Sequence, residues 1–76
     1  MLTAYDIRNS KEFRLGREIL VKRYDYLCHR NRWHTAHITA IYPWVLGVRL
    51  DKTGRDITVN KMDFYGEELK AKFIID

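Results

Sequence analysis

The clearest alternation of apolar and polar positions lies between Trp44 and Met62, on either side of the polar segment 51–55. Every second residue of the two flanking runs is apolar and would face one side of a sheet: Leu46, Val48, Leu50, Ile57 and Val59. The polar segment contains Gly54, which tolerates the positive φ that a tight turn needs. This pattern predicts a β-hairpin with strands near residues 44–51 and 56–62.

Two further strands are predicted upstream. Residues 33–42 are rich in β-branched and aromatic side chains, as strands are. Their alternation gathers three apolar residues on one face: Ala36, Ile38 and Ala40. Pro43 ends this strand because it has no N–H to donate to a sheet. Residues 17–24 form another β-rich run, which is followed by a polar loop over residues 25–32. Four consecutive strands with short connections are therefore expected.

Two signals modify this sheet. Gly47 lies inside a predicted strand, where it adds no packing and costs backbone entropy, so it indicates a bulge or a sharp bend. Beyond Asp63 the period changes, because Leu69 and Phe73 are four positions apart, with acids before them and lysines among them. A short C-terminal helix is predicted there. The expected fold class is mostly β, a small antiparallel barrel that this helix closes.

Length and composition favour one domain over residues 1–76. The chain is 46% hydrophobic, which supplies one modest core and nothing for a second. Residues 1–15 show only the capping-box spacing of Thr3 and Asp6, which allows a brief helical turn. No apolar run approaches the roughly 20 residues of a membrane span. The N-terminus does not resemble a secretory signal, and Cys28 is the only cysteine. The sequence predicts a soluble cytoplasmic protein held together by packing alone.

Charge is concentrated in the first 32 residues. That segment holds eight basic and four acidic side chains, which gives 8 minus 4, or +4, whereas residues 33–76 hold six of each sign. A basic surface attracts phosphates or acidic proteins over about one Debye length. Excesses of this size also occur on ordinary solvated faces, so charge alone does not identify a partner.

The order of the predicted elements resembles the Tudor and KOW branch of the SH3-like barrels. Residues 32–38, Arg-Trp-His-Thr-Ala-His-Ile, are similar to the Tudor strand that opens with a Trp and carries an inward Ala soon after. Residues 48–59 resemble the next hairpin of that fold. The resemblance covers about residues 16–66 and implies an SH3-like barrel. Three aromatic residues would supply only part of a cage for methylated side chains: Tyr24, Tyr26 and Trp33.

The segment 24–37 is the candidate binding surface. It mixes planar rings with basic side chains that can stack on bases and pair with phosphates. The predicted binding residues lie in and beside this segment: Lys22, Arg23, Arg30, Arg32, Trp33 and His34. The alternative is that Trp33 belongs to the core and the arginines are merely solvated, because a large aromatic residue in so small a domain is usually mostly buried. Trp44 faces the same alternative.

Catalysis and metal binding find little support. Four residues include groups that could serve as nucleophile, base or metal ligand: Cys28, His29, His34 and His37. One cysteine does not complete the usual four-ligand zinc site, and His34 and His37 would point to opposite faces of a shared strand. Asp51 and Asp56 flank a turn, where acids more often serve turn geometry. We expect no catalytic residue, no metal and no cofactor.

Two functions remain open. The first is a non-enzymatic module that binds nucleic acid through the basic, aromatic loop. The second is a phage or mobile-element protein that binds a larger host protein and inhibits or adapts it. The acids of the second half favour this alternative, because they would repel phosphate: Asp51, Asp56, Asp63, Glu67, Glu68 and Asp76. The basic first half tips the prediction slightly towards nucleic acid.

Overall fold

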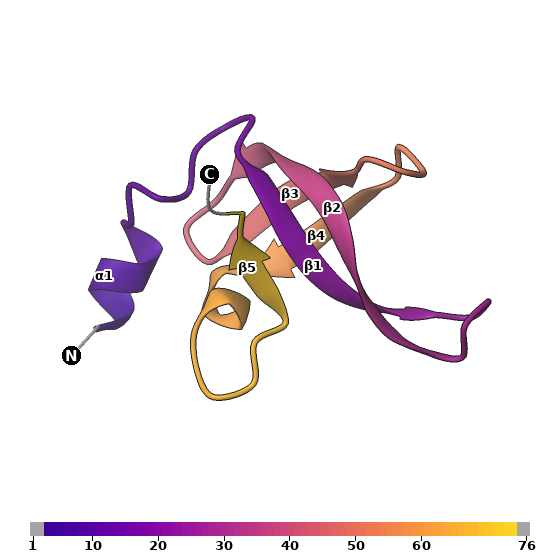
Figure 1. The fold of residues 1–76 in the computed structure, drawn as a ribbon. Coiled ribbons are helices and arrows are strands. Elements are labelled where there is room, and N and C mark those ends of the chain that lie inside the picture. Colours follow the sequence, from indigo (N-terminus) through magenta and orange to yellow (C-terminus); the bar gives the residue numbers. More distant parts are fainter. Residues whose placement is uncertain (1–2, 75–76) are drawn as a thin grey trace.

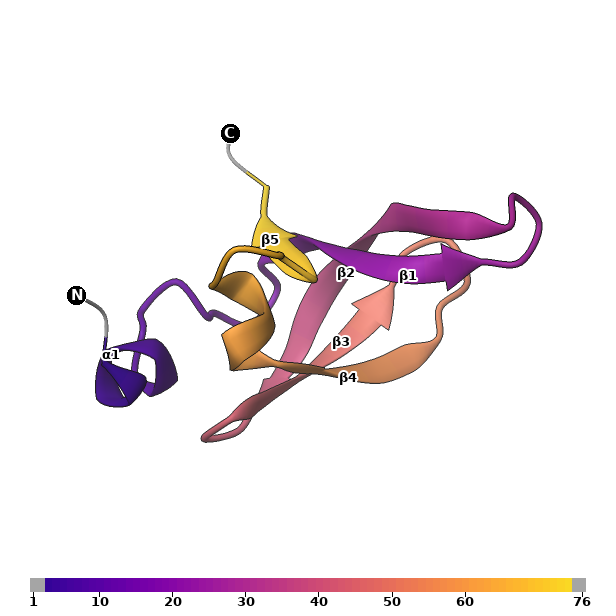
Figure 2. The ribbon, with the colours of Figure 1, turned by 90° about the horizontal axis from the view of Figure 1, so that it is seen from below.

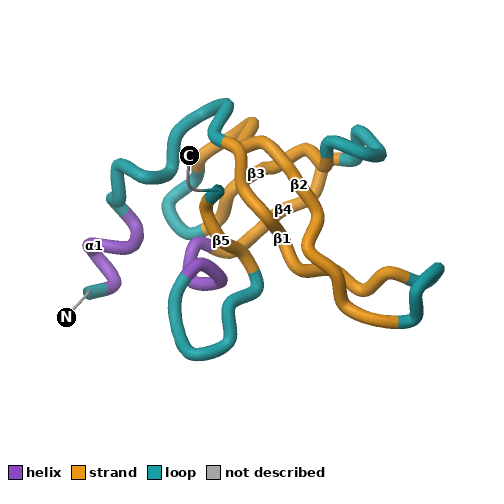
Figure 3. The backbone as a smooth tube through the Cα atoms, viewed as in Figure 1, coloured by secondary structure: helices purple, strands orange, loops and turns teal. Residues whose placement is uncertain are grey.

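The computed structural model describes residues 3–74. Seven elements follow one another in this part of the chain: α1 (Ala4–Arg8), β1 (Glu18–Asp25), β2 (Arg30–Ile41), β3 (Val45–Leu50), β4 (Asp56–Asn60), the 3-10 helix η1 (Lys61–Phe64) and β5 (Ala71–Phe73). All five strands belong to one antiparallel sheet in the order β4-β3-β2-β1-β5 (Figure 3). The prediction of a mostly β, antiparallel protein is confirmed. The sheet is not closed, since β4 and β5 are its two edges.

The sheet is strongly twisted (Figures 1 and 2), and one face of every strand contributes to the core. The long strand β2 makes this possible, because its first part pairs with β1 and its last part with β3. Apolar residues at alternate strand positions meet inside, together with two phenylalanines: Phe13, Ile19, Val21, Ala36, Ile38, Leu46, Val48, Leu50, Val59, Phe64 and Ala71. The faces predicted for the residue 44–62 hairpin are therefore correct.

β2 bulges at Thr39. Ile38 pairs with Val48, whereas Ala40 pairs with Gly47, so that two steps along β2 match one step along β3. A Cβ atom on Gly47 would lie 3.2 Å from the Cβ of Ala40, which is closer than ordinary contact. The glycine thus lets the two strands approach at the bend. The predicted bulge is present, but it is in β2 rather than in the strand that holds the glycine.

The helix predicted over the residues beyond Asp63 does not form there. One helical turn forms, as η1, but it begins at Lys61, where the Asn60 side chain accepts a 2.9 Å hydrogen bond from the Met62 N–H. Gly66 then turns the chain with a φ of 101°. Residues 71–73 form β5 and pair with β1 at residues 19–21.

Packing explains why the helical spacing of Leu69 and Phe73 is overridden. β1 offers an unpaired edge, and β5 satisfies its backbone groups. As part of β5, Phe73 stacks on Phe64 with 4.7 Å between ring centroids and lies 5.5 Å from Phe13. The aromatic cluster therefore stabilises a strand where local spacing favours a helix.

α1 has the predicted capping box. The Thr3 Oγ1 accepts the Asp6 N–H at 3.2 Å, and the Asp6 carboxylate accepts the Thr3 N–H at 3.0 Å. The hydrogen bond from the Thr3 backbone N–H is the main reason why the pKa of Asp6 lies below its ordinary value. Ile7 is the buried residue of α1. Within residues 3–74, neither α1 nor η1 has the length and apolar character that crossing a membrane requires.

Candidate functional site: a basic groove between two hairpins

The β1–β2 hairpin is longer than predicted. Its loop contains only residues 26–29, not 25–32, because the strands extend through Asp25 on one side and from Arg30 on the other. Asp25 fixes the turn: its Oδ1 accepts the backbone N–H of Leu27 at 2.9 Å and that of Cys28 at 3.4 Å. The bond from Leu27 is also the main cause of the lowered pKa of Asp25. Arg30 and Arg32 therefore lie on a strand and not in a loop.

Strand alternation sorts the predicted residues onto two faces. Val21 faces the core and pairs with His34, and two positions further Arg23 pairs with Arg32 on the same side. Lys22 and its partner Trp33 lie on the other side of the hairpin. The core face thus continues beyond the apolar residues as a basic surface.

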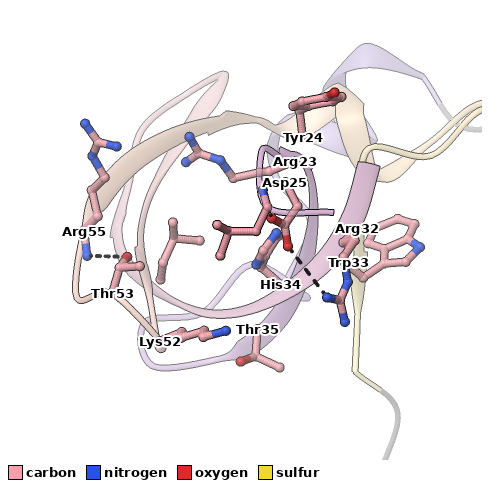
Figure 4. Close-up of a pocket in the computed structure, with 12 residues that line it drawn as sticks. Arg23, Tyr24, Asp25, Arg32, Trp33, His34, Thr35, Lys52, Thr53 and Arg55 are labelled. Atoms are coloured by element: carbon pink, nitrogen blue, oxygen red, sulfur yellow. Dashed lines mark hydrogen bonds and ion pairs between the residues drawn. The ribbon is translucent and has the colours of Figure 1, made fainter. Parts of the chain in front are cut away.

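A groove of about 480 Å³ lies where this basic surface passes the turn between β3 and β4 (Figure 4). Its cationic side chains come from two hairpins: Arg23, Arg32, Lys52 and Arg55. The buried side chain of Leu50 lines it beside the core, and His34 borders it from β2. Asp25 is the one carboxylate in its lining. The groove therefore carries a clear excess of positive charge.

Little of this charge is neutralised within the described residues. Arg32 lies 3.7 Å from the Asp25 carboxylate, and it also donates a 3.3 Å hydrogen bond to Cys28 Sγ. Among residues 3–74, Arg23, Lys52 and Arg55 form no ion pair. Three cations therefore remain free to meet an anionic ligand, while Arg32 braces the hairpin loop.

The outer face of the hairpin carries a second group of cations. Trp33 is 36% exposed, and two ammonium groups lie over its ring, with Lys72 Nζ 4.4 Å and Lys22 Nζ 5.2 Å from the centroid. Trp33 borders the groove, but its ring points away from the centre of the opening (Figure 4). Of the two alternatives for this residue, burial in the core is not realised. Trp44 is likewise half-exposed, at 43%.

The structure thus brings three of the predicted binding residues, Arg23, Arg32 and His34, into one groove. Lys22 and Trp33 form the outer cluster with Lys72, and Arg30 is exposed near the hairpin tip. Sequence reasoning missed Lys52, Arg55 and Lys72. The first two could have been found from topology, because in four consecutive antiparallel strands the first and third turns emerge at the same end of the sheet.

The four possible metal ligands do not form one cluster. Cys28 is exposed in the hairpin loop and His34 borders the groove. His37 lies on the outer face, where its Nδ1–H donates to Asp51 at 2.5 Å and its Nε2 lies 3.3 Å from Glu18. The part of the chain that the structure describes holds no group of three or more His, Cys, Asp or Glu placed to bind a metal ion. The absence of a required metal, and of catalysis, stays a prediction.

The bond from His37 to Asp51 is the main reason why the pKa of His37 lies above its ordinary value, and Glu18 adds to the effect. Asp51 opens the turn that carries Lys52 and Arg55. His37 therefore ties this turn to β1 and β2 from the side opposite the groove.

Comparison of the chain with protein-family models, with curated proteins and with solved structures gave no match. The function is therefore inferred from the side chains themselves.

Proposed function

We propose that this protein is a non-enzymatic module that binds nucleic acid through the basic groove. The observation that carries the proposal is the gathering of four cationic side chains from two separate hairpins around a single carboxylate. Cations gathered in this way create a positive potential that attracts anions, and a phosphate backbone supplies the opposite charge.

A polyanion suits the site better than a small isolated anion. The groove volume lies within the range of ordinary ligand sites, but positive charge does not stop at its edges. Arg30 continues it towards the hairpin tip, and Lys22 and Lys72 continue it over the outer face. Tyr24, which borders the groove, is 47% exposed and offers a ring for stacking. A nucleic acid presents many phosphates and can contact several of these groups at once.

We also infer that the sheet forms the wall of a partly open, SH3-like barrel. Two features support this proposal. The edge strand β4 faces β1 across a second cavity of about 470 Å³, which residues 21–23 and 57–59 line from the two sides. η1 and β5 follow β4 and return the chain to the free edge of β1. The barrel fold does not by itself indicate a ligand.

Apolar residues at the other end of the sheet favour the alternative function, binding of a host protein. Four exposed side chains gather around the β2–β3 turn and η1: Ile41, Tyr42, Trp44 and Met62. Single exposed apolar residues are normal on a protein surface, but such groups often mark protein interfaces. A cation is present here too, since the Arg8 guanidinium lies 5.9 Å from the centroid of the Trp44 ring, whereas four cationic side chains line the groove.

Binding of fluorescent oligonucleotides of mixed sequence, measured from about 50 to 200 mM salt, tests the proposal. We expect the logarithm of the affinity to fall linearly with the logarithm of the salt concentration, because each neutralised phosphate releases counterions. A pull-down from host lysate with and without nuclease provides the comparison. Absence of oligonucleotide binding, together with capture of a host protein that survives nuclease, would contradict the proposal and support the alternative.

A further inference from the structure

We propose, as an extension that rests on the proposed function, that the β1–β2 hairpin is an arm that enters the major groove of duplex DNA. The arm is the segment 22–33, which projects beyond the core at one end of the molecule (Figures 1 and 2). None of its residues is buried, although its strands remain paired up to Asp25 and Arg30. This regular two-stranded ribbon adds nothing to the core, so we infer that it serves binding.

The dimensions of the arm match those of the DNA groove. Three residue pairs lie beyond Lys22 and Trp33, which corresponds to about 10 Å of strand before the loop. The major groove of B-DNA is about 8.5 Å deep and about 12 Å wide, and it admits a two-stranded β-ribbon. The minor groove, about 6 Å wide, does not accept such a ribbon without deformation. The arm is long enough to bring its loop to the edges of the bases.

Charge is present on both faces of the arm. A ribbon inside a DNA groove has a phosphate backbone on each side, so it needs cations on each side. Arg23 lies on the inner face, towards the basic groove of the protein, and Lys22 and Lys72 flank Trp33 on the outer face. Asp25, the only acid of the arm, is engaged by the loop backbone and by Arg32. A single strand lying in the protein groove would leave the outer cations without a partner.

The basic groove and the outer cations can each meet one of the two phosphate backbones of a duplex. One phosphate backbone would lie in the protein groove, between the arm and the turn that carries Lys52 and Arg55. The other backbone would then pass the outer cluster around Trp33. In this position the arm meets the bases with its loop, where Tyr26 is 80% and Leu27 is 91% exposed. An apolar side chain at this place can contact the methyl group of thymine, which is displayed only in the major groove.

Fluorescence anisotropy with the full chain and three labelled probes tests the inference. The probes are a mixed-sequence DNA duplex of about 20 base pairs, one of its single strands, and the same duplex with glucosylated 5-hydroxymethylcytosine in place of cytosine. The sugar fills the major groove and leaves the phosphate charge unchanged. We expect the plain duplex to bind at least about tenfold more tightly than the glucosylated duplex. Distamycin, which occupies the minor groove, should change the affinity by less than about twofold.

A neutral substitution in the loop tests the arm while every cation of the basic groove stays in place, although Leu27 itself also borders that groove. Leu27→Ser should weaken binding to the plain duplex several-fold and leave binding to the glucosylated duplex unchanged. Leu15→Ser, which alters a residue that is 69% exposed but lies outside the arm, is the matched control and should have no effect. Equal affinity for both duplexes, or preference for the single strand, would contradict entry of the arm into the major groove. If that binding is still salt-dependent, the proposed function stands. If no probe binds in a salt-dependent way, both proposals fail.

Discussion

His37 holds one charged cluster on the outer face of the sheet. Both of its ring nitrogens face carboxylates, Asp51 at 2.5 Å and Glu18 at 3.3 Å, so the cluster is most stable when the imidazole carries two protons. The pKa of His37 is accordingly raised. A raised folded-state pKa means that the folded protein holds the proton more tightly than the unfolded chain does.

We therefore predict that the His37 contribution to stability is fully present below about pH 6.5, the ordinary value for histidine, and is lost as the pH rises through the raised pKa of the folded state. Urea denaturation at a series of pH values from 5.5 to 9 measures it. His37→Gln should remove this component of the pH dependence. If the variant and the wild type lose the same stability over this range, the cluster does not act as described.

Lys61 attaches α1 to the rest of the protein. Its side chain is only 3% exposed, and its Nζ donates a 2.7 Å hydrogen bond to the carbonyl of Arg8, at the end of α1. The ammonium also lies 5.3 Å from the centroid of Phe13. Burial, with a smaller effect of Arg8, lowers the pKa of Lys61. A buried cation at the carbonyl end of a helix is held by that carbonyl and by the helix dipole.

Lys61→Met keeps most of the apolar stem but removes the bond to Arg8. We predict faster hydrogen exchange of the amides at the end of α1, with the β1–β2 amides unchanged, because only the helix loses its anchor. Lys11→Met, at an exposed position, is the control. Unchanged exchange in α1 would show that Ile7 alone holds the helix in place.

At the scale of elements, the hairpin between Trp44 and Met62 could be predicted almost completely, because turn chemistry and alternation agree there. The strand ends around residues 25–32 could not, since polar side chains on both faces of a ribbon leave no alternation to follow. β5 was missed for a different reason. Its three residues form a strand only because β1 has a free edge and Phe73 has aromatic neighbours, and both conditions arise from distant parts of the chain.

The core side of β3 yields a stability prediction. Val48 is fully buried and lies opposite Ile38 and Ile57. Val48→Asp should unfold the domain, because burying an unpaired carboxylate costs several kcal/mol and a 76-residue domain has only about 4–11 kcal/mol of stability. Thr58→Asp, at an exposed position of the adjacent strand, should stay folded. Circular dichroism of both variants decides the matter, and a folded Val48→Asp variant would contradict this core.

At the scale of the whole molecule, the position of the charge matters more than its amount. The excess of positive charge belongs to the first 32 residues of the sequence, and two of those residues, Arg23 on β1 and Arg32 on β2, line the groove. Lys52 and Arg55 come from the half that is neutral overall. Composition could not reveal them, because Asp51 and Asp56 cancel them in a count but face other partners in space: His37 and Arg49.

The central claim is that phosphates bind in the groove, and a comparison of matched variants tests it most directly. Arg23→Gln with Arg55→Gln removes two groove cations without disturbing the contact between Arg32 and Asp25. Lys11→Gln with Arg14→Gln removes the same charge from exposed positions that precede β1, at the end of the strand away from the arm. Both double variants have the same net charge.

The measurement is the salt dependence of DNA duplex binding for the wild type and both double variants, each checked for folding. The account predicts that the groove variant binds more weakly and that its slope falls by about 1.8, because each lost contact with B-DNA removes about 0.9. The control variant should keep nearly the slope of the wild type. Equal losses in the two variants would mean that net charge, and not the groove, attracts the DNA, and would contradict the account.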